Sequence, residues 1–375
     1  MTKLILAVSI VGQILIAPNV YAATAEFLEI AQGPNYSFAR GVSDDGSTVV
    51  GSYFGSPFYW TRQVGTYPLP GGSLFGDAVA ASADGSILVG SGGGRGLRWQ
   101  SPFVQQPEQT PPHLSATLHA VSDDGTVIAG QTYFGNEYQA MRWTASTGIV
   151  QLGTLGLSPR YDNNSIANGI SADGSIVVGR STSPNGNTAY RWTESSGMQP
   201  ISQAADKLYF SVANDISSNG NVIVGLAGNS LPWQAVRWSA ASGVVGLGYL
   251  RTGDHHSEAK GVSADGSVIV GESFGAGHET AVIWTERNGM RSIKDILVGH
   301  GLDLSRWRLT SATDVSANGR VVVGYGVGPG GQSRAWVAIL PVPEPRSFCL
   351  ATSVALVAVI RRSSGRIIQM AKSDV

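Results

Sequence analysis

The chain has 375 residues, a formal net charge of −1 and 14% charged residues, so its composition gives no electrostatic reason to expect nucleic-acid binding. Hydrophobic residues make up 42% of the sequence, which is ample for a packed core. The single cysteine, Cys349, lies in a C-terminal apolar segment, which excludes disulfides, a cysteine nucleophile and a cysteine-ligated metal from the rest of the chain.

The N-terminus has the order of a secretory signal peptide. Lys3 supplies positive charge, and the apolar stretch from Leu4 to Ala17 is shorter than the roughly 20 residues that a membrane span needs. Ala22 offers a small residue for cleavage. We therefore expect residues 1–22 to be a signal peptide and the protein to be exported through the inner membrane. The alternative is a buried N-terminal helix.

One phrase of nine residues recurs through the chain: Ser, any residue, Asp or Asn, Gly, two residues, two mostly aliphatic residues and Gly. The copies begin at Ser43, Ser82, Ser122, Ser171, Ser217, Ser263 and Ser316. Each copy is followed by a tryptophan, at Trp60, Trp99, Trp143, Trp192, Trp238, Trp284 and Trp336. A spacing of roughly 40 to 50 residues with strong strand signals is typical of propeller blades or another solenoid.

The fourth unit shows how each copy divides into four strands. Residues 167–171 form a short strand, and Asp173-Gly174 is a hairpin turn signal that requires a positive φ. Residues 175–179 continue as an aliphatic strand covered on both faces. Residues 188–193 and 198–201 supply the third and fourth strands. Four antiparallel strands describe one propeller blade.

The two ends of the repeat region predict a closed ring. The seventh unit stops at Pro341 without a fourth strand, and residues 26–30 form a strand that precedes the first unit. The N-terminal strand can therefore complete the seventh blade and cover its exposed edge. Small residues such as Ala39 and Gly41 in the first strand suit the crowding near an axis. We predict an all-β fold, a seven-bladed β-propeller of four-stranded blades over residues 25–340, closed by the N-terminal strand.

The conspicuous residues of the phrase are interpreted as structural. Asn219 and Asn318 replace Asp in two copies, and both residue types suit the same turn, so turn chemistry is favoured over calcium binding or acid catalysis. The regular position of the tryptophans in the third strand favours packing between blades over platforms for sugar stacking.

The units resemble the extracellular HAF repeats, which pair this phrase with a following Arg-Trp and then Leu-Gly-x-Leu. The matches include Arg142-Trp143 with residues 152–155, and Arg237-Trp238 with residues 247–250. The resemblance covers roughly residues 39–340. It implies an exported repeat protein and carries no defined activity and no catalytic set.

One dense group of metal-ligating residue types is present, Asp254-His255-His256 with Glu258. Adjacent histidines on an extended chain point apart, so a solvated loop is favoured over a zinc or copper site. The sequence contains no nucleophile elbow, phosphate loop or HExxH pattern. We therefore expect no enzyme activity, no metal and no cofactor.

The best candidates for ligand binding are the residues that differ between copies. The residue three positions before each repeated Ser is mostly polar, and we expect it to begin the innermost strand at the channel mouth. Exposed-looking aromatic residues in the variable loops join this set. The candidate ligand-binding residues are Arg40, His119, Asn168, Asn214, Lys260, Tyr133, Tyr138, Tyr161 and Trp307. Ordinary solvated surface is the alternative.

The C-terminal 35 residues carry a second targeting signal. Val342, Pro343, Glu344 and Pro345 are followed by an apolar stretch over residues 347–360 and then by Arg361 and Arg362. This order resembles the PEP-CTERM sorting signal, and it implies that a membrane exosortase recognises residues 341–375 and cleaves near the Pro-Glu-Pro. A plain transmembrane tail anchor, with the two arginines on the cytoplasmic flank, is the alternative.

Two functions follow from these observations. The first is an exported binding or structural module of the cell surface or extracellular matrix, with polysaccharide as the expected partner. The second is an exported polysaccharide hydrolase or lyase on a propeller scaffold. An enzyme needs convergent acid and base groups, and the spacing assembles none, so the first function is preferred.

Overall fold

The computed structural model describes residues 24–341 apart from 72–75, 101–107, 110–114, 135–136, 157–162, 185, 202–209, 229–231 and 276. Residues Thr24–Leu340 form one compact unit. The expected signal peptide and the sorting residues Pro343, Glu344, Pro345, Arg361 and Arg362 lie outside the described residues. Within the described residues, no helix has both the length and the apolar character to cross a bilayer.

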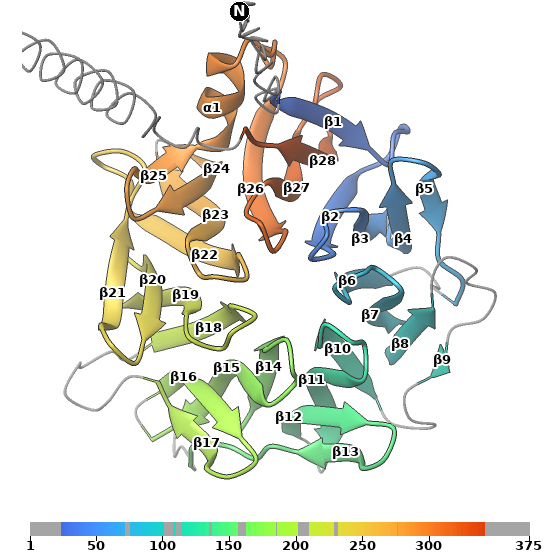
Figure 1. The fold of residues 1–375 in the computed structure, drawn as a ribbon, viewed down its shortest axis with the longest axis vertical. Helices are drawn as coiled ribbons and strands as arrows, with labels where there is room; N and C mark the ends of the chain where they lie inside the picture. Colours follow the sequence, from blue (N-terminus) through green and yellow to red (C-terminus); the bar gives the residue numbers. More distant parts are fainter. Residues whose placement is uncertain are drawn as a thin grey trace, which may run out of the picture. The chain divides into compact units, whose positions relative to one another are not determined.

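Seven antiparallel sheets of four strands stand around one axis, which confirms the predicted seven-bladed β-propeller (Figure 1). The first four blades consist of β2 (Ser37–Val42), β3 (Thr48–Tyr53), β4 (Ser56–Thr61) and β5 (Gly65–Pro68); β6 (Asp77–Ala81), β7 (Ile87–Gly92), β8 (Arg95–Gln100) and β9 (Glu108–Gln109); β10 (Ala116–Val121), β11 (Val127–Phe134), β12 (Glu137–Thr144) and β13 (Gly148–Gln151); and β14 (Ser165–Ile170), β15 (Ile176–Ser183), β16 (Gly186–Thr193) and β17 (Gly197–Pro200).

The remaining blades follow the same order, with one short helix between the last two. They consist of β18 (Phe210–Ile216), β19 (Ile223–Gly228), β20 (Gln234–Ser239) and β21 (Gly243–Gly248); β22 (His256–Val262), β23 (Val268–Gly275), β24 (His278–Thr285) and β25 (Gly289–Ser292); α1 (Ile293–Gly299); and β26 (Arg308–Val315), β27 (Val321–Val327), β28 (Ser333–Ile339) and β1 (Glu26–Ile30).

The N-terminal strand closes the ring as predicted. β1 pairs antiparallel with β28 from Glu26 opposite Ile339 to Ile30 opposite Ala335. The backbone edge of β28 is thereby paired, and the first and last segments of the ring share one sheet.

Each phrase builds the hairpin turn between the first and second strands of its blade. In the fourth blade the Ser171 hydroxyl donates to Asp173 Oδ1 (2.7 Å) and accepts from the Ile176 N–H (3.0 Å). Asp173 Oδ1 also accepts from the Ser175 N–H at 3.0 Å. Only Gly174 has positive φ (68°), so the loop is a type I turn followed by a left-handed Gly rather than the expected two-residue turn.

The same geometry appears where Asn replaces Asp. The Ser217 hydroxyl donates to Asn219 Oδ1 at 2.8 Å, and the Ser316 hydroxyl donates to Asn318 Oδ1 at 3.0 Å. An amide oxygen accepts these bonds as a carboxylate oxygen does. The repeated acidic residue therefore acts in the turn.

The second residue of the phrase ties neighbouring blades together. Its backbone bonds run around the axis from blade to blade, for example from Ala83 N to Asp123 O (3.0 Å) and from Ala317 N to Asp44 O (3.0 Å). Such bonds link six of the seven junctions; the described residues show none between the fifth and sixth blades. The turns converge on the centre of the ring in Figure 1.

The core lies between blades. Seven clusters of buried side chains each combine residues from two adjacent sheets, and each includes one of the seven repeated tryptophans or has one packed against it. Trp99 and Trp336 are fully buried. The repeated tryptophans therefore pack between blades, as predicted.

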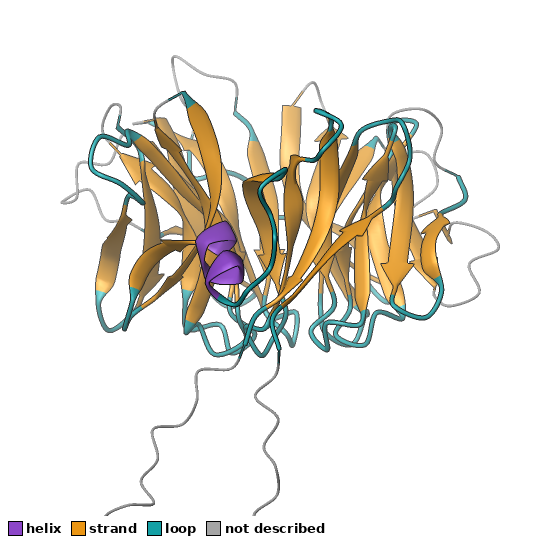
Figure 2. Ribbon diagram, turned by 90° about the horizontal axis from the view of Figure 1, so that it is seen from above, coloured by secondary structure: helices purple, strands orange, loops and turns teal. Residues whose placement is uncertain are grey.

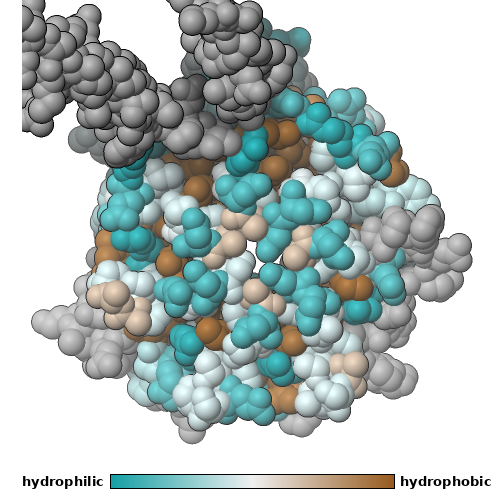
Figure 3. Space-filling view, in the orientation of Figure 1, coloured by the Kyte–Doolittle hydropathy of each residue, from teal (hydrophilic) through white to brown (hydrophobic). Residues whose placement is uncertain are grey.

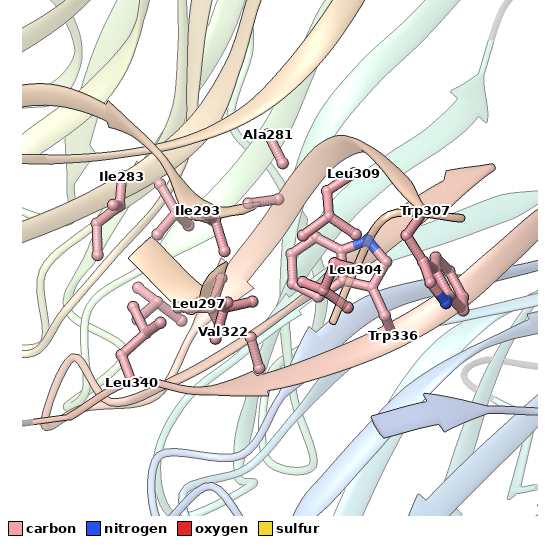
Figure 4. Close-up of a cluster of buried hydrophobic side chains, with 14 residues drawn as sticks. Ala281, Ile283, Ile293, Leu297, Leu304, Trp307, Leu309, Val322, Trp336 and Leu340 are labelled. Atoms are coloured by element: carbon pink, nitrogen blue, oxygen red, sulfur yellow. The ribbon is translucent and has the colours of Figure 1, made fainter. Parts of the chain in front are cut away.

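The seventh tryptophan departs from the register of the others. Trp60 stands opposite Val49, but Trp336 stands opposite Gly324, two residues earlier in its strand. Ala338 occupies the equivalent position in β28, opposite Val322. Trp336 fills the space beside α1 and the segment before β26, as Figure 4 shows.

The two faces of the ring differ (Figure 2). We call the side that carries the phrase turns the turn face, and the side that carries the connections from second to third strands and from blade to blade the loop face. Because β1 runs from the turn face and β28 runs towards it, Thr24 and Leu340 both lie on the turn face.

Substitution of the turn glycine should be more costly than substitution of a comparable glycine elsewhere. Gly174 and Gly197 have φ of 68° and 64°, so alanine at either position carries a left-handed penalty of about 1–2 kcal/mol. A Cβ at Gly174 would lie 2.5 Å from Val127 of the preceding blade, whereas a Cβ at Gly197 meets nothing within 4 Å. We expect Gly174→Ala to lose about 1–3 kcal/mol more than Gly197→Ala in urea unfolding. Equal losses would contradict packing of the turn against the neighbouring blade.

Candidate binding site at the axial channel

The residue three positions before each repeated Ser sits at a β-bulge. All seven innermost strands change register there: Ala39 and Gly41, for instance, pair with consecutive residues of β3 and leave Arg40 unpaired between them. A bulge re-aims its side chain, and the bulge residues all line the central cavity. These residues are Arg40, Val79, His119, Asn168, Asn214, Lys260 and Thr313.

The axial cavity has a volume of about 220 Å³ and runs from the bulge residues to the phrase turns. Figure 3 shows a small opening at the centre of the ring. The bulges lie in the middle of the innermost strands; Arg40, for example, is the fourth residue of six in β2. The expectation that these residues begin their strands was therefore wrong, because the bulge, and not the strand end, turns the side chain inwards.

Three of the bulge side chains are committed to holding neighbouring blades together. Asn168 Nδ2 donates to Ala213 O at 2.9 Å and Asn214 Nδ2 donates to Ala259 O at 2.8 Å. Thr313 Oγ1 donates to Ala39 O at 3.0 Å. Asn168 and Asn214 line the channel as expected of ligand-binding residues, but their amide groups already serve the junctions between blades.

Arg40 reaches from the first blade to the second. Its Nε lies 2.8 Å from Asp77 Oδ2, and its guanidinium carbon lies 5.3 Å from the centre of the Phe38 ring. Burial raises the pKa of Asp77, and the Arg40 charge partly opposes that rise. The Arg40 side chain is 37% exposed, so solvent reaches it.

Lys260 is surrounded by carboxylates. Its Nζ lies 2.9 Å from Glu272 and 3.8 Å from Glu258, and a Glu258 oxygen also accepts from Asn214 Nδ2 at 2.8 Å. Ligand atoms of His256, Glu258 and Glu272 lie within 4.8 Å of one another. The Lys260 ammonium supplies the positive charge at this cluster.

The sequence cluster of Asp254, His255, His256 and Glu258 does not come together as one group. Asp254 Oδ2 accepts from the Ser273 hydroxyl at 2.8 Å, and the His255 ring packs edge-on against Phe274. His256 opens β22 and lies close to Glu258 and Glu272 instead. The sequence did not point to Glu272, because it belongs to the second strand and only strand pairing brings it opposite Glu258.

His119 differs from the other two basic bulge residues in being uncharged. Burial lowers the pKa of its imidazole to about 4, so it is neutral at pH 7. Its Nε2 is buried and has no hydrogen-bond partner among the described residues. The channel therefore holds a neutral base as well as two cations.

Four carboxylates line the part of the cavity nearest the turn face, and the sequence analysis missed them. Asp44 and Asp123 are second residues of the phrase, and Asp215 and Asp314 follow the bulges of their blades. Glycine or alanine stands at the position of Asp215 and Asp314 in the other five copies. This departure from the repeat was the signal in the sequence that could have pointed to these two carboxylates. None of the four makes an ion pair with Lys or Arg in the described part of the chain.

Asp215 and Asp314 join adjacent blades through backbone groups. Asp215 Oδ2 accepts from Val262 N, and Asp314 Oδ2 accepts from Val42 N, both at 2.9 Å. Burial, with smaller repulsion from neighbouring carboxylates, raises the pKa of Asp215 to about 7 and of Asp44 to about 6. Burial and repulsion from Asp215 also raise the pKa of Asp314.

Two aromatic pairs stand exposed on the loop face. Tyr133 and Tyr138 are directly opposed in β11 and β12, 42% and 46% exposed, with ring centres 5.0 Å apart. Tyr36 and Phe54 are 44% and 48% exposed, with ring centres 5.7 Å apart. The Phe54 N–H donates to Tyr36 O at 3.0 Å, and Phe54 holds a positive φ of 49°, which is uncommon outside Gly. Residues with strained backbone cluster at ligand and active sites, so this position is a candidate.

Of the other predicted aromatic residues, one is buried and one falls outside the description. Trp307 is 9% exposed and packs edge-on against Phe27, with ring centres 5.0 Å apart. The expectation that Trp307 is an exposed aromatic residue of a loop was wrong, because α1 and β1 cover the loop in which it lies. Tyr161 lies outside the described residues.

A scan against protein-family models gave no match to the chain, and a search of curated proteins gave none either. Among solved structures, an oligogalacturonate lyase in complex with manganese is similar with a TM-score of 0.54 and 13% identity, over 85% of this chain and 96% of that one. An oligogalacturonate lyase from Vibrio parahaemolyticus is similar with a TM-score of 0.55 and 11% identity, over 85% and 97%. At such identity the likeness establishes the propeller scaffold alone.

The buried carboxylate Asp215 should make the stability of the ring depend on pH. A pKa of about 7 in the folded protein, above its ordinary 3.8, means that its stabilising protonation is complete below about pH 4 and is lost as the pH rises through 7. Asn at this position cannot ionise. We therefore expect the free energy of unfolding of Asp215→Asn, measured relative to that of the unmodified chain, to increase as the pH is raised from 4.5 to 8.

Asp124→Asn is the matched control. A hydrogen bond from the Ser122 hydroxyl is the main cause that lowers the pKa of Asp124 below its ordinary 3.8, so its contribution is lost only below about pH 4, and the difference for Asp124→Asn should stay constant between pH 4.5 and 8. Urea unfolding at both pH values measures the two differences. A difference for Asp215→Asn that does not change with pH would contradict the assignment.

Proposed function

We propose that the chain is an exported binding module of the bacterial cell surface or extracellular matrix that recognises polysaccharide on the loop face of the ring. The expected signal peptide and sorting signal support export, and the expected sorting signal implies an exosortase-type enzyme as a processing partner at the inner membrane. The observation that carries the binding role is the pair of exposed aromatic platforms on the loop face. Exposed apolar side chains rimmed by polar groups mark interaction sites.

The platforms suit sugar rings because both are rigid. The backbone bond from Phe54 to Tyr36 and the equivalent bond from Tyr133 N to Ser115 O (2.8 Å) fix the two loops at the same position of their blades. Aromatic side chains with few rotatable bonds give large contact areas at low entropic cost. The apolar faces of pyranose rings can lie on such rings while their hydroxyls stay hydrated.

The polar mouth of the channel supplies hydrogen-bonding groups beside these platforms. Arg40 is joined to the first platform by its contact with Phe38, whose ring centre lies 5.7 Å from that of Tyr36. A binding surface that combines aromatic faces with a few placed polar groups is the common form of a ligand site.

A second candidate is a polysaccharide lyase or hydrolase, and His119 favours it. A lyase removes a proton beside a sugar carboxylate, which needs a neutral base and a cation. The channel holds the uncharged His119 imidazole together with Arg40 and Lys260. The oligogalacturonate lyases that share the propeller scaffold make this activity worth testing.

Removal of one platform should weaken polysaccharide binding. A glycan array with the purified ring identifies the bound polymers, and titration of the strongest one measures affinity. We expect the double variant Tyr133→Ala, Tyr138→Ala to bind about tenfold more weakly, which corresponds to ~1.4 kcal/mol. Tyr67→Ala, which removes a tyrosine of similar exposure (48%) from an outermost strand, should bind unchanged.

The same mixtures of the ring and its polysaccharide also distinguish the two proposed functions. Binding without release of new reducing or unsaturated sugar ends supports the binding module and excludes the lyase or hydrolase. Release of sugar ends that stops in His119→Gln would replace the binding module by the second candidate. A blank array with folded protein would contradict both.

A further inference from the structure

The guanidinium of Arg40 is held in place through only one of its three nitrogens. The Nε pairs with the Asp77 carboxylate, and the guanidinium lies over the Phe38 ring. The two terminal nitrogens make no hydrogen bond or ion pair within the described residues. A planar fork of donors that is oriented from behind and open in front matches the geometry of a carboxylate.

Three other cations of the ring, Lys260, Arg334 and Arg62, are arranged differently. Lys260 is enclosed by Glu258 and Glu272, and Arg334 uses its terminal nitrogens on Asn35 O and Gln332 Oε1. Arg62 pairs with Glu26 through a terminal nitrogen, beside the turn face. Among these, Arg40 is the cation whose terminal donors remain available at the channel.

Arg40 also lies over one ring of a row of aromatic side chains. The row begins at the exposed Phe54 and continues through Tyr36 and Phe38 to Tyr325, with neighbouring ring centres 5.0–5.7 Å apart. A sugar ring placed on the exposed part of the row would bring a substituent towards the guanidinium. The aromatic ring beneath the cation also keeps water from one side of it, which strengthens its attraction for an anion.

From this arrangement we infer that Arg40 binds the carboxylate of an acidic sugar, so that the ligand of the loop face is a uronic-acid-containing polysaccharide. The inference rests on the proposed polysaccharide binding and adds the class of polymer. The aromatic row holds the sugar ring, and the terminal nitrogens of Arg40 donate two parallel hydrogen bonds to its carboxylate oxygens. No proton moves and no bond breaks in this step.

The test compares polygalacturonate with its fully methyl-esterified form, which has the same sugar ring without the charge. We expect the ring to bind polygalacturonate about tenfold to a hundredfold more tightly, with a preference that shrinks as salt is added. Arg40→Gln should bind both polymers with the affinity that the unmodified ring shows for the ester. Arg40→Lys keeps the charge without the fork and should retain only a small part of the preference.

The controls and outcomes keep the two proposals distinct. Arg62→Gln removes an exposed arginine beside the turn face and should leave the preference intact, and thermal unfolding confirms that each variant is folded. Equal binding of the two polymers, tighter binding of dextran sulfate than of polygalacturonate, or an unchanged preference in Arg40→Gln would overturn the inference while leaving polysaccharide binding in place. No binding of either polymer or of any neutral glycan would overturn both proposals.

Discussion

Seven strands meet around one axis, and the lack of space there governs the other features of the ring. A Cβ at Gly41 would lie 2.5 Å from the carbonyl oxygen of Val79 in the next blade, and a Cβ at Gly261 would lie 2.9 Å from the Cα of Asp314. The backbone bonds between successive phrase turns hold the strands at this spacing. Most positions of the phrase therefore keep the same residue type from copy to copy. At the bulge, by contrast, the innermost strand has room for a long side chain.

This constraint divides the channel into two electrostatic parts. Towards the loop face, the Arg40 and Lys260 cations are each placed by carboxylates, and the Phe38 ring lies against the first. Towards the turn face, Asp215 supports the junction between the fifth and sixth blades and Asp314 supports the junction between the seventh and first, each by accepting a backbone N–H, at the cost of mutual repulsion. The loop-face side of the channel thus carries directed donors, while Asp215 and Asp314 on the turn-face side hold neighbouring blades together.

The sequence was sufficient to predict the blades and the structural role of the phrase, because the repeat shows both seven times. It also predicted the closure by β1, because the seventh unit lacks a fourth strand and a spare strand precedes the first unit. It also placed the ligand candidates at the bulge residues, although it could not show that a bulge existed. Trp307 was misjudged because its burial depends on α1 and Phe27, which are distant in sequence. Glu272 and Asp77 were missed because they meet Lys260 and Arg40 only through strand pairing and blade packing.

The central claim is that recognition lies on the loop face, at the residues that differ between copies, and that the repeated residues build the scaffold. A crystal structure of the ring with a short oligomer of galacturonic acid tests it most directly. The account predicts a sugar ring against Tyr36 and Phe54, with its carboxylate within hydrogen-bond distance of both terminal nitrogens of Arg40. An oligomer bound on the turn face, or on the outer strands away from Arg40, would contradict it.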